Sequence, residues 1–295
     1  MSAQDMAIAT AGSRNRMNRI VIYGLLLLFA AVYLLPLFVM LTTSFKSLDE
    51  VRGGNILALP ASPTADAWFR AWGSACIGVT CEGIKGYFWN SIKMVVPAVL
   101  ISTFLGALNG YVLTKWRFPG HKLFFGLMLF ACFIPFQAVL IPMARVLGML
   151  GMSNSTAGLV LVHVVYGIGF TTLFFRNYYD AFPSELVHSA QMDGAGFFTI
   201  FWRILLPSSA PIVVVTIIYQ FTNIWNDFLF GVSFSSGAAA PMTVALNNLV
   251  ASSTGVKEYN VDMAAAVIAA LPTLLVYVLA GRYFMRGLMA GAVKG

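Results

Sequence analysis

Six long apolar runs without a charged residue constrain the fold of this chain more than any other feature. They cover residues 20–41, 94–114, 123–144, 159–175, 205–226 and 263–281. A helix needs about 20 residues to cross about 30 Å of hydrocarbon, so each run predicts one transmembrane helix. Most runs contain proline, which a helix bundle tolerates because neighbouring groups satisfy the freed carbonyls. The pattern predicts an all-α integral membrane protein with six transmembrane helices over residues 20–282.

The distribution of charged residues predicts on which side of the membrane the termini lie. Of 295 residues, 59% are apolar and 10% are charged, against about a quarter charged in a soluble domain, so no separate soluble catalytic domain is expected. Six crossings put both termini on one side. That side carries eleven lysines and arginines against six in the opposite loops, and such an excess marks the cytoplasm. We therefore expect cytoplasmic tails at residues 1–19 and 283–295. The net charge of +7 follows from this topology and implies no nucleic-acid partner.

The first loop outside the cytoplasm holds two cysteines. Cys76 and Cys81 lie between the first two predicted spans, where disulfides persist. A bridge between them and two unpaired thiols both remain open at this point. The surrounding segment, residues 43–89, is rich in tryptophan, which is typical of a membrane interface and also suits a docking surface.

A cytoplasmic loop, residues 183–207, carries the most informative pattern. A short helix is predicted to begin at Pro183 or Ser184 and to stop at Gly194. Leu186, Val187, Ala190 and Met192 give it apolar surface. Helices this short need tertiary contacts in water, so this surface is expected to pack on the membrane domain, the lipid interface or another protein.

The same loop resembles the EAA loop of ABC importer permeases, whose pattern is Glu-Ala-Ala, three residues, Gly, nine residues, Ile, one residue, Leu-Pro. The residues that match it are Ala190, Asp193, Gly194, Ala195, Ile204, Leu206 and Pro207. His188 stands where Glu is usual, and Ser189 stands where the first Ala is usual. Glu185 is the remaining acid nearby. These ten residues are the candidates for coupling to an ATPase.

The resemblance extends over nearly the whole chain. The six spans, the Trp225 to Phe228 segment and the C-terminal Arg286-Gly287-Leu288 with residues 290–295 are similar to carbohydrate permeases of the maltose/glycerol-phosphate type, including the smaller maltose permease subunit. The Cys76 to Cys81 loop and the segment at residues 88–91 are more similar to glucose or mannose importer permeases.

This resemblance implies the type I ABC importer architecture and its partners. These are a second permease, a dimer of ATP-binding subunits, an extracytoplasmic sugar-binding protein and the bilayer of the bacterial cytoplasmic membrane. It implies a monosaccharide such as glucose or mannose, or a small oligosaccharide, as substrate. The chain has no phosphate-binding Gly-x-x-x-x-Gly-Lys-Ser/Thr loop, so we expect no cofactor in it. ATP and Mg²⁺ are expected on the partner, and the chain itself is expected not to be an enzyme.

Few polar residues lie within the spans. A sugar path or an outer gate is one interpretation of Gln220, Asn223, Trp225, Asn226 and Asp227; hydrogen bonds between helices and a structural helix end are the other. His163 is expected to be a packing residue, because no metal-ligand partner accompanies it. An ATP-independent secondary transporter is the alternative, but it would be expected to hold ionisable residues at mid-membrane. A membrane enzyme would need a catalytic set within the spans, and the sequence shows none.

Overall fold

The computed structural model describes residues 3–116, 118–251 and 256–292, so Val293, Lys294 and Gly295 of the C-terminal motif lie outside the described residues. Within these ranges the regular structure is helical, apart from an isolated bridge between Ile77 and Thr80. The helices are α1 (Ala3–Ser44), α2 (Leu48–Arg52), α3 (Asp66–Gly73), α4 (Lys85–Lys115), α5 (His121–Cys132), α6 (Phe136–Met149), α7 (Thr156–Asp180), α8 (Ser184–Met192), α9 (Phe197–Ile200), the π-helical turn η1 (Phe201–Leu205), α10 (Leu206–Ser208), α11 (Ala210–Trp225), α12 (Leu229–Phe234), the 3₁₀ turn η2 (Gly237–Ala239), α13 (Met242–Ala251) and α14 (Tyr259–Ala292).

Four of the predicted spans are single long helices: Asn18–Ser44 within α1, α4, α7, and Tyr259–Gly281 within α14. The third and fifth predicted spans are each a pair of helices, bent by 103° between α5 and α6 and by 78° between α10 and α11. The predicted helix at each of these two places is therefore broken rather than continuous. With each bent pair counted as one span, the described residues give the predicted six.

Proline chemistry explains the first bend. Pro135 breaks the helix between α5 and α6, because this residue has no amide hydrogen and disfavours a helical conformation at the residue before it. Its ψ of 136° takes the chain out of the helix. The hydroxyl of Tyr166 donates to the carbonyl of Ile134 at 2.5 Å, which satisfies an acceptor that the break exposes. Four other prolines do remain inside helices: Pro36, Pro97, Pro142 and Pro272.

The second bend lies at Ser209, between Pro207 and Pro211. The buried hydroxyl of Ser209 lies 2.5 Å from the carbonyl of Leu205 and 2.9 Å from the hydroxyl of Tyr179 on α7. Pro211 sits in the first turn of α11, where a missing amide hydrogen costs little. Helix α11, the second half of this bent span, therefore begins at Ala210.

The chain divides into two compact units, Met1–Ala71 with Thr254–Val267, and Trp72–Ser253 with Ile268–Gly295. In the first unit, residues 18–38 of α1 are all exposed although they are strongly apolar. Such a surface requires lipid or another apolar partner. Helix α1 begins at Ala3 and α14 ends at Ala292, so helix continues through most of both predicted tails.

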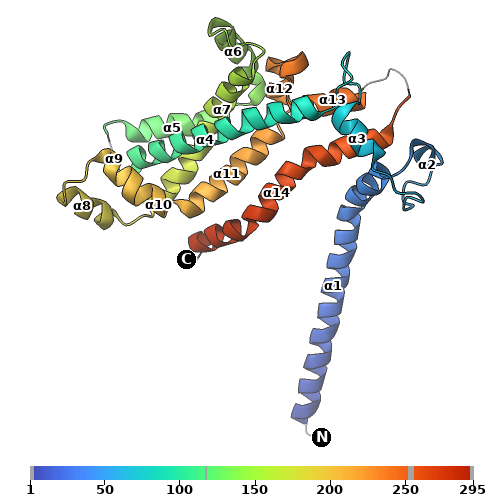
Figure 1. The fold of residues 1–295 in the computed structure, drawn as a ribbon. Helices are drawn as coiled ribbons and strands as arrows, with labels where there is room; N and C mark the ends of the chain where they lie inside the picture. The colour runs from blue at the N-terminus through green and yellow to red at the C-terminus, as the bar shows by residue number, and fades with distance from the viewer. Residues whose placement is uncertain (1–2, 117, 252–255, 293–295) are drawn as a thin grey trace. The chain divides into compact units, whose positions relative to one another are not determined.

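The second unit is built on the pair α4 and α7, which lie side by side in Figure 1 and pack along each other. Gly106 and Gly110, one turn apart on α4, make this contact close. A Cβ on Gly106 would lie 2.7 Å from the backbone carbon of Thr171. A Cβ on Gly110 would lie 2.8 Å from the backbone nitrogen of Arg176. Small residues four apart allow helix backbones to approach in a membrane protein.

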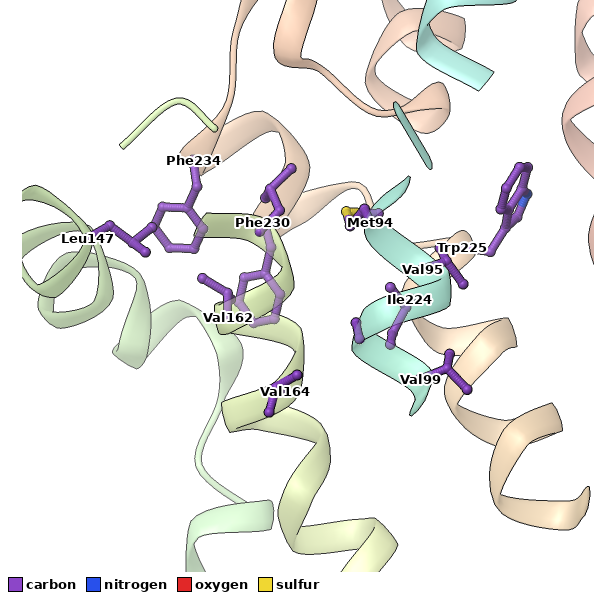
Figure 2. Packing of buried hydrophobic residues seen from close by; sticks show 12 residues of the cluster. Met94, Val95, Val99, Leu147, Val162, Val164, Ile224, Trp225, Phe230 and Phe234 are labelled. Carbon is purple, nitrogen blue, oxygen red and sulfur yellow. The ribbon is translucent and has the colours of Figure 1, made fainter. Parts of the chain in front are cut away.

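Towards the N-terminal end of α7, this unit has an apolar core. Figure 2 shows Phe230 and Phe234 of α12 reaching towards Val162 of α7 and Leu147 of α6, while Ile224 of α11 faces α4. The core thus ties the second half of the bent span, α6, to both α7 and α12. It positions the polar residues at the C-terminal end of α11.

Candidate functional site

The predicted coupling loop forms helix α8 as the sequence indicates. Pro183 precedes the helix, and Glu185 lies in its first turn, where a negative charge is favourable. Gly194 ends the helix with φ of 81°, a conformation that glycine adopts without steric cost. The amide of Ala195 donates to the carbonyl of Ala190 at 2.9 Å, and the amide of Gly194 donates to that of Gln191 at 3.0 Å. These bonds satisfy carbonyls that the helix end would otherwise leave free.

One face of α8 is anchored to its own membrane domain. Val187 is 2% exposed and packs in a cluster with Tyr111 of α4 and Tyr179 of α7. The ammonium group of Lys115 donates to the carbonyl of Phe182 at 2.7 Å and to the hydroxyl of Ser184 at 3.1 Å. The ends of α4 and α7 therefore fix where α8 begins.

The rest of the surface of α8 is largely uncovered. Leu186 is 51% exposed and Met192 is 89% exposed, and both are apolar. His188 and Ser189, the two departures from the family pattern, are also exposed. The Nδ1 atom of His188 lies 3.3 Å from the amide oxygen of Gln191. The predicted apolar surface thus divides between contact with the protein's own domain and a free face.

The remaining coupling candidates follow the helix. Asp193 and Gly194 are exposed at its end. Ile204 and Leu206 are half-buried and pack against the cluster that holds Val187. The elements η1 and α10 therefore connect α8 to the transmembrane helices. Pro207 lies exposed in α10, just before the bend at Ser209.

The second predicted group, at the C-terminal end of α11, separates into structural and cavity-lining residues. Trp225 is 1% exposed; its indole donates to the carbonyl of Ala269 at 2.8 Å and its ring stacks on Phe221. Asn226 is exposed and donates to the carbonyl of Thr222 at 2.9 Å. Neither Trp225 nor Asn226 lines the cavity described below.

Asp227 caps a helix and also lies close to a side chain of another helix. Its Oδ2 atom accepts hydrogen bonds from the amides of Phe230 and Gly231, each at 3.1 Å, so the carboxyl caps helix α12. The same oxygen lies 3.8 Å from Nε2 of His163 on α7, which is too long for a hydrogen bond. Asp227, just after the C-terminal end of α11, thus has a neighbour from another helix, His163 of α7.

Gln220 joins three helices. Its amide donates to the hydroxyl of Ser102 on α4 at 2.9 Å, and Thr171 of α7 donates to the carbonyl of Ser102, also at 2.9 Å. Gly167 makes room for the amide, because a Cβ there would lie 2.0 Å from its nitrogen. Hydrogen bonds between membrane helices of this kind stabilise the bundle.

A cavity of about 90 Å³ lies between α6, α7, α11 and α12. Of the predicted group, Gln220, Asn223 and Asp227 line it. The sequence interpretation missed its aromatic walls and treated His163 as packing. One signal was present: Tyr219, Asn223 and Asp227 are four residues apart, and this spacing places residues on one helix face. The aromatic walls are Phe136, Tyr166, Phe170, Tyr219 and Phe230.

A larger cavity, of about 410 Å³, lies over the loop that contains the two cysteines. Cys76 and Cys81 form a disulfide that closes a hairpin, at whose tip Val79 is fully exposed. The amide of Asn90 donates to the carbonyls of Ala238 and Ala240 at 2.6 and 3.1 Å, which ties η2 to the start of α4. These contacts fix the walls of the larger cavity.

Comparison with known proteins identifies this architecture. The family model described as a binding-protein-dependent transport system inner membrane component matches residues 98–288. A probable ABC transporter permease protein of Pyrococcus horikoshii is 40% identical over 279 residues, covering 94% of this chain and 98% of the relative. The xylose/arabinose import permease protein of Haloferax volcanii is 33% identical and covers 99% of this chain and 98% of the relative.

A further relative has a similar sequence, and a solved structure has a similar fold. The glucose import system permease protein of Saccharolobus solfataricus is 30% identical, covering 92% of this chain and 95% of the relative. A chain of a bacterial ABC transporter involved in the import of the acidic polysaccharide alginate superposes with a TM-score of 0.80 at 22% identity, covering 92% of this chain and 98% of that one; it shares the fold. This chain therefore belongs to the family of binding-protein-dependent transport system inner membrane components and is a permease subunit of an ABC importer.

Proposed function

We propose that this chain is a permease subunit of an ATP-driven sugar importer, in which α8 docks on a separate ATPase. The observation that carries the proposal is the divided surface of α8. Val187 holds the helix to the membrane domain, while Leu186 and Met192 present apolar side chains outward within a loop of EAA spacing. A free apolar face with one anchored side suits a helix that transmits force between two bodies.

The proposed coupling is mechanical. ATP and Mg²⁺ bind to the partner ATPase, and closure of that partner moves α8 together with the ends of α4 and α7. Rigid units of this kind switch a transporter between two access states. A nucleotide drives such a switch only as far as it favours one state over the other. A second permease, an ATPase dimer and an extracytoplasmic sugar-binding protein complete the proposed assembly.

For the substrate we propose a monosaccharide such as glucose or mannose, or a small oligosaccharide. In support, relatives are named for the import of xylose/arabinose, diacetylchitobiose and glucose. We place the protein in the cytoplasmic membrane of a bacterium with both termini inside; an Escherichia coli relative is named an inner membrane permease. The free surface near the disulfide hairpin is the proposed contact with the binding protein.

The docking surface is tested with the complex purified from its native membrane. Replacing Met192 with glutamate puts a charge on the proposed contact, and we expect the ATPase subunits to be lost from the complex. Met149, at the C-terminal end of α6, is 74% exposed and allows the same substitution as a control, which should leave the ATPase bound. Recovery of the unmodified chain without any ATPase would overturn the proposal, as would equal retention by Met192→Glu and Met149→Glu.

Sugar import itself is tested in proteoliposomes that contain the whole complex, ATP and the binding protein. Radiolabelled D-glucose, D-mannose, D-xylose and diacetylchitobiose form the panel. We expect ATP-dependent uptake of at least one. Uptake that persists without ATP would favour a secondary transporter instead.

A further inference from the structure

The cavity beside Asp227 contains a buried polar atom without a partner. His163 is 5% exposed, and its Nε2 atom has no hydrogen-bond partner among the described residues. His163 lines the same cavity as Asp227 and Asn223, and its Nε2 atom lies 3.8 Å from Oδ2 of Asp227. Leaving a buried donor or acceptor unpaired is unfavourable, so this position favours a ligand atom that bonds to it.

The distance between His163 and Asp227 indicates which kind of ligand atom fits between them. Nε2 of His163 and Oδ2 of Asp227 are 3.8 Å apart, too far for a direct bond and close enough for one oxygen to lie within hydrogen-bond distance of both. A hydroxyl group both donates and accepts. The hydroxyl can donate to the carboxylate of Asp227, which can accept a further hydrogen bond besides those from the two backbone amides. The oxygen of the same hydroxyl can accept a hydrogen bond from the imidazole nitrogen of His163.

The walls of the cavity suit the rest of a sugar. Aromatic rings of α6, α7 and α12 line the same cavity as His163 and Asp227. Between ring centroids, Phe136 lies 4.7 Å from Tyr166, and Phe230 lies 5.6 Å from His163. Sites that combine apolar walls with a few placed polar groups are typical of small-molecule recognition. Among the described residues there is no cluster of three or more metal-ligating side chains, so a cation fits less well.

We propose that His163, Asp227 and Asn223 form a subsite that binds one hydroxyl-bearing edge of the transported sugar, an inference that rests on the proposed function as a sugar importer. A volume of about 90 Å³ is below the roughly 300 Å³ at which pockets enclose a whole drug-sized ligand. The subsite therefore holds one edge of the sugar, and the facing permease completes the path. In the proposed topology it lies at the outer ends of α7 and α11, where sugar arrives.

The test asks whether the side chain of His163 recognises one particular hydroxyl group of the sugar. In the complete complex, uptake of the panel sugar transported best is compared with uptake of its monodeoxy analogues, for the unmodified chain and for His163→Leu. The binding protein is the same in both complexes, so its own selectivity cancels in the ratio. We expect removal of one particular hydroxyl to reduce uptake by about fivefold in the unmodified complex and to make little difference in His163→Leu.

Further variants separate binding from structure. His163→Gln keeps a donor near the position of Nε2 and should restore part of the deoxy-sugar discrimination. Asn223→Ala should reduce it. Asn226→Ala is the matched control, because Asn223 and Asn226 each donate to a carbonyl four residues earlier, at 2.8 and 2.9 Å, and only Asn223 lines the cavity.

The outcomes are distinct. If His163→Leu and Asn223→Ala show the same discrimination as the unmodified complex at every hydroxyl position, the subsite does not contact sugar and holds ordered water only. If the discrimination changes equally in Asn226→Ala, the effect is structural and the inference is overturned. If the unmodified complex transports none of the panel sugars with ATP, the proposed function fails before the subsite is reached.

Discussion

At the scale of single residues, Gly194 gives the sharpest prediction. Its φ of 81° is the left-handed conformation, and a Cβ there would meet no atom within 4 Å. The cost of a side chain is therefore one of backbone conformation alone, about 1–2 kcal/mol. We expect Gly194→Val to disorder the end of α8 and to lower the amount of ATPase that co-purifies by about fivefold or more.

Gly196 supplies the matched control for that substitution. It lies two residues further along in an extended conformation, with φ of −77° and ψ of 175°, and a Cβ there also meets no atom within 4 Å. Valine is favourable in extended backbone. Gly196→Val should therefore retain the ATPase, and equal loss in both variants would show that the side chain, not the backbone of Gly194, causes the effect.

Residue patterns in the sequence predicted the coupling loop better than the cavity. The helix, its stop at Gly194 and the apolar side chains of α8 follow from local rules that act within about ten residues. The pairing of His163 with Asp227 joins two residues of different helices, separated by the whole coupling loop. Without knowledge of how α7 packs on α11, a single buried histidine has no identifiable partner.

At the scale of helices, the contact between α4 and α7 predicts a stability effect. A Cβ on Gly106 would lie 2.5 Å from the Cβ of Thr171 and 2.7 Å from its backbone carbon, so α4 and α7 must separate to admit it. Overpacking of this kind costs about 1–3 kcal/mol. We expect Gly106→Ala to lower the thermal unfolding midpoint of the purified complex.

The comparison for Gly106 is Gly126 on α5. A Cβ on Gly126 meets no atom within 4 Å, and alanine is the better helix former. Gly126→Ala should leave the midpoint unchanged or raise it slightly. An unchanged midpoint in Gly106→Ala would mean that the two helices are not in close contact in the assembled complex.

The disulfide hairpin gives a second prediction at this scale. A crosslink around so short a loop stabilises by about 2 kcal/mol in the chain-entropy model. Replacing Cys76 and Cys81 with serine should therefore open the hairpin more often and speed proteolysis at the exposed Val79. Mass spectrometry of the early fragments measures this. Cys132, a free cysteine on α5, should have no effect on that cleavage when replaced with serine.

Helix positions were more predictable than helix continuity. The apolar runs coincide with the four long helices and the two bent pairs of the described residues, because a crossing helix needs about 20 apolar residues. Whether a proline kinks or breaks a helix depends on whether other donors reach the carbonyls that are left without a helical partner. Pro97 stays inside α4, whereas at the break before α6 the hydroxyl of Tyr166, from another helix, donates to the carbonyl of Ile134. That partner is a tertiary contact, which hydrophobic length does not encode.

At the scale of the whole molecule, the free surfaces imply an assembly. Helix α1 exposes apolar side chains over residues 18–38, and α8 exposes Leu186 and Met192. The first surface matches the hydrocarbon of the bilayer or a second permease, and the second matches a cytoplasmic partner. This division holds only if the chain crosses the membrane with its termini inside, which is the expectation drawn from the lysine and arginine distribution.

That orientation is tested by labelling cysteines from outside intact cells, with Cys132 replaced by serine and the disulfide left in place. Leu57, exposed between α2 and α3, and Thr199, exposed on α9, are each replaced with cysteine. A membrane-impermeant maleimide should label Leu57→Cys in intact cells and Thr199→Cys only after permeabilisation, because six crossings with cytoplasmic termini place the two sites on opposite sides. The reverse pattern would move α8 outside, away from ATP, and no coupling to a cytoplasmic ATPase would then be possible.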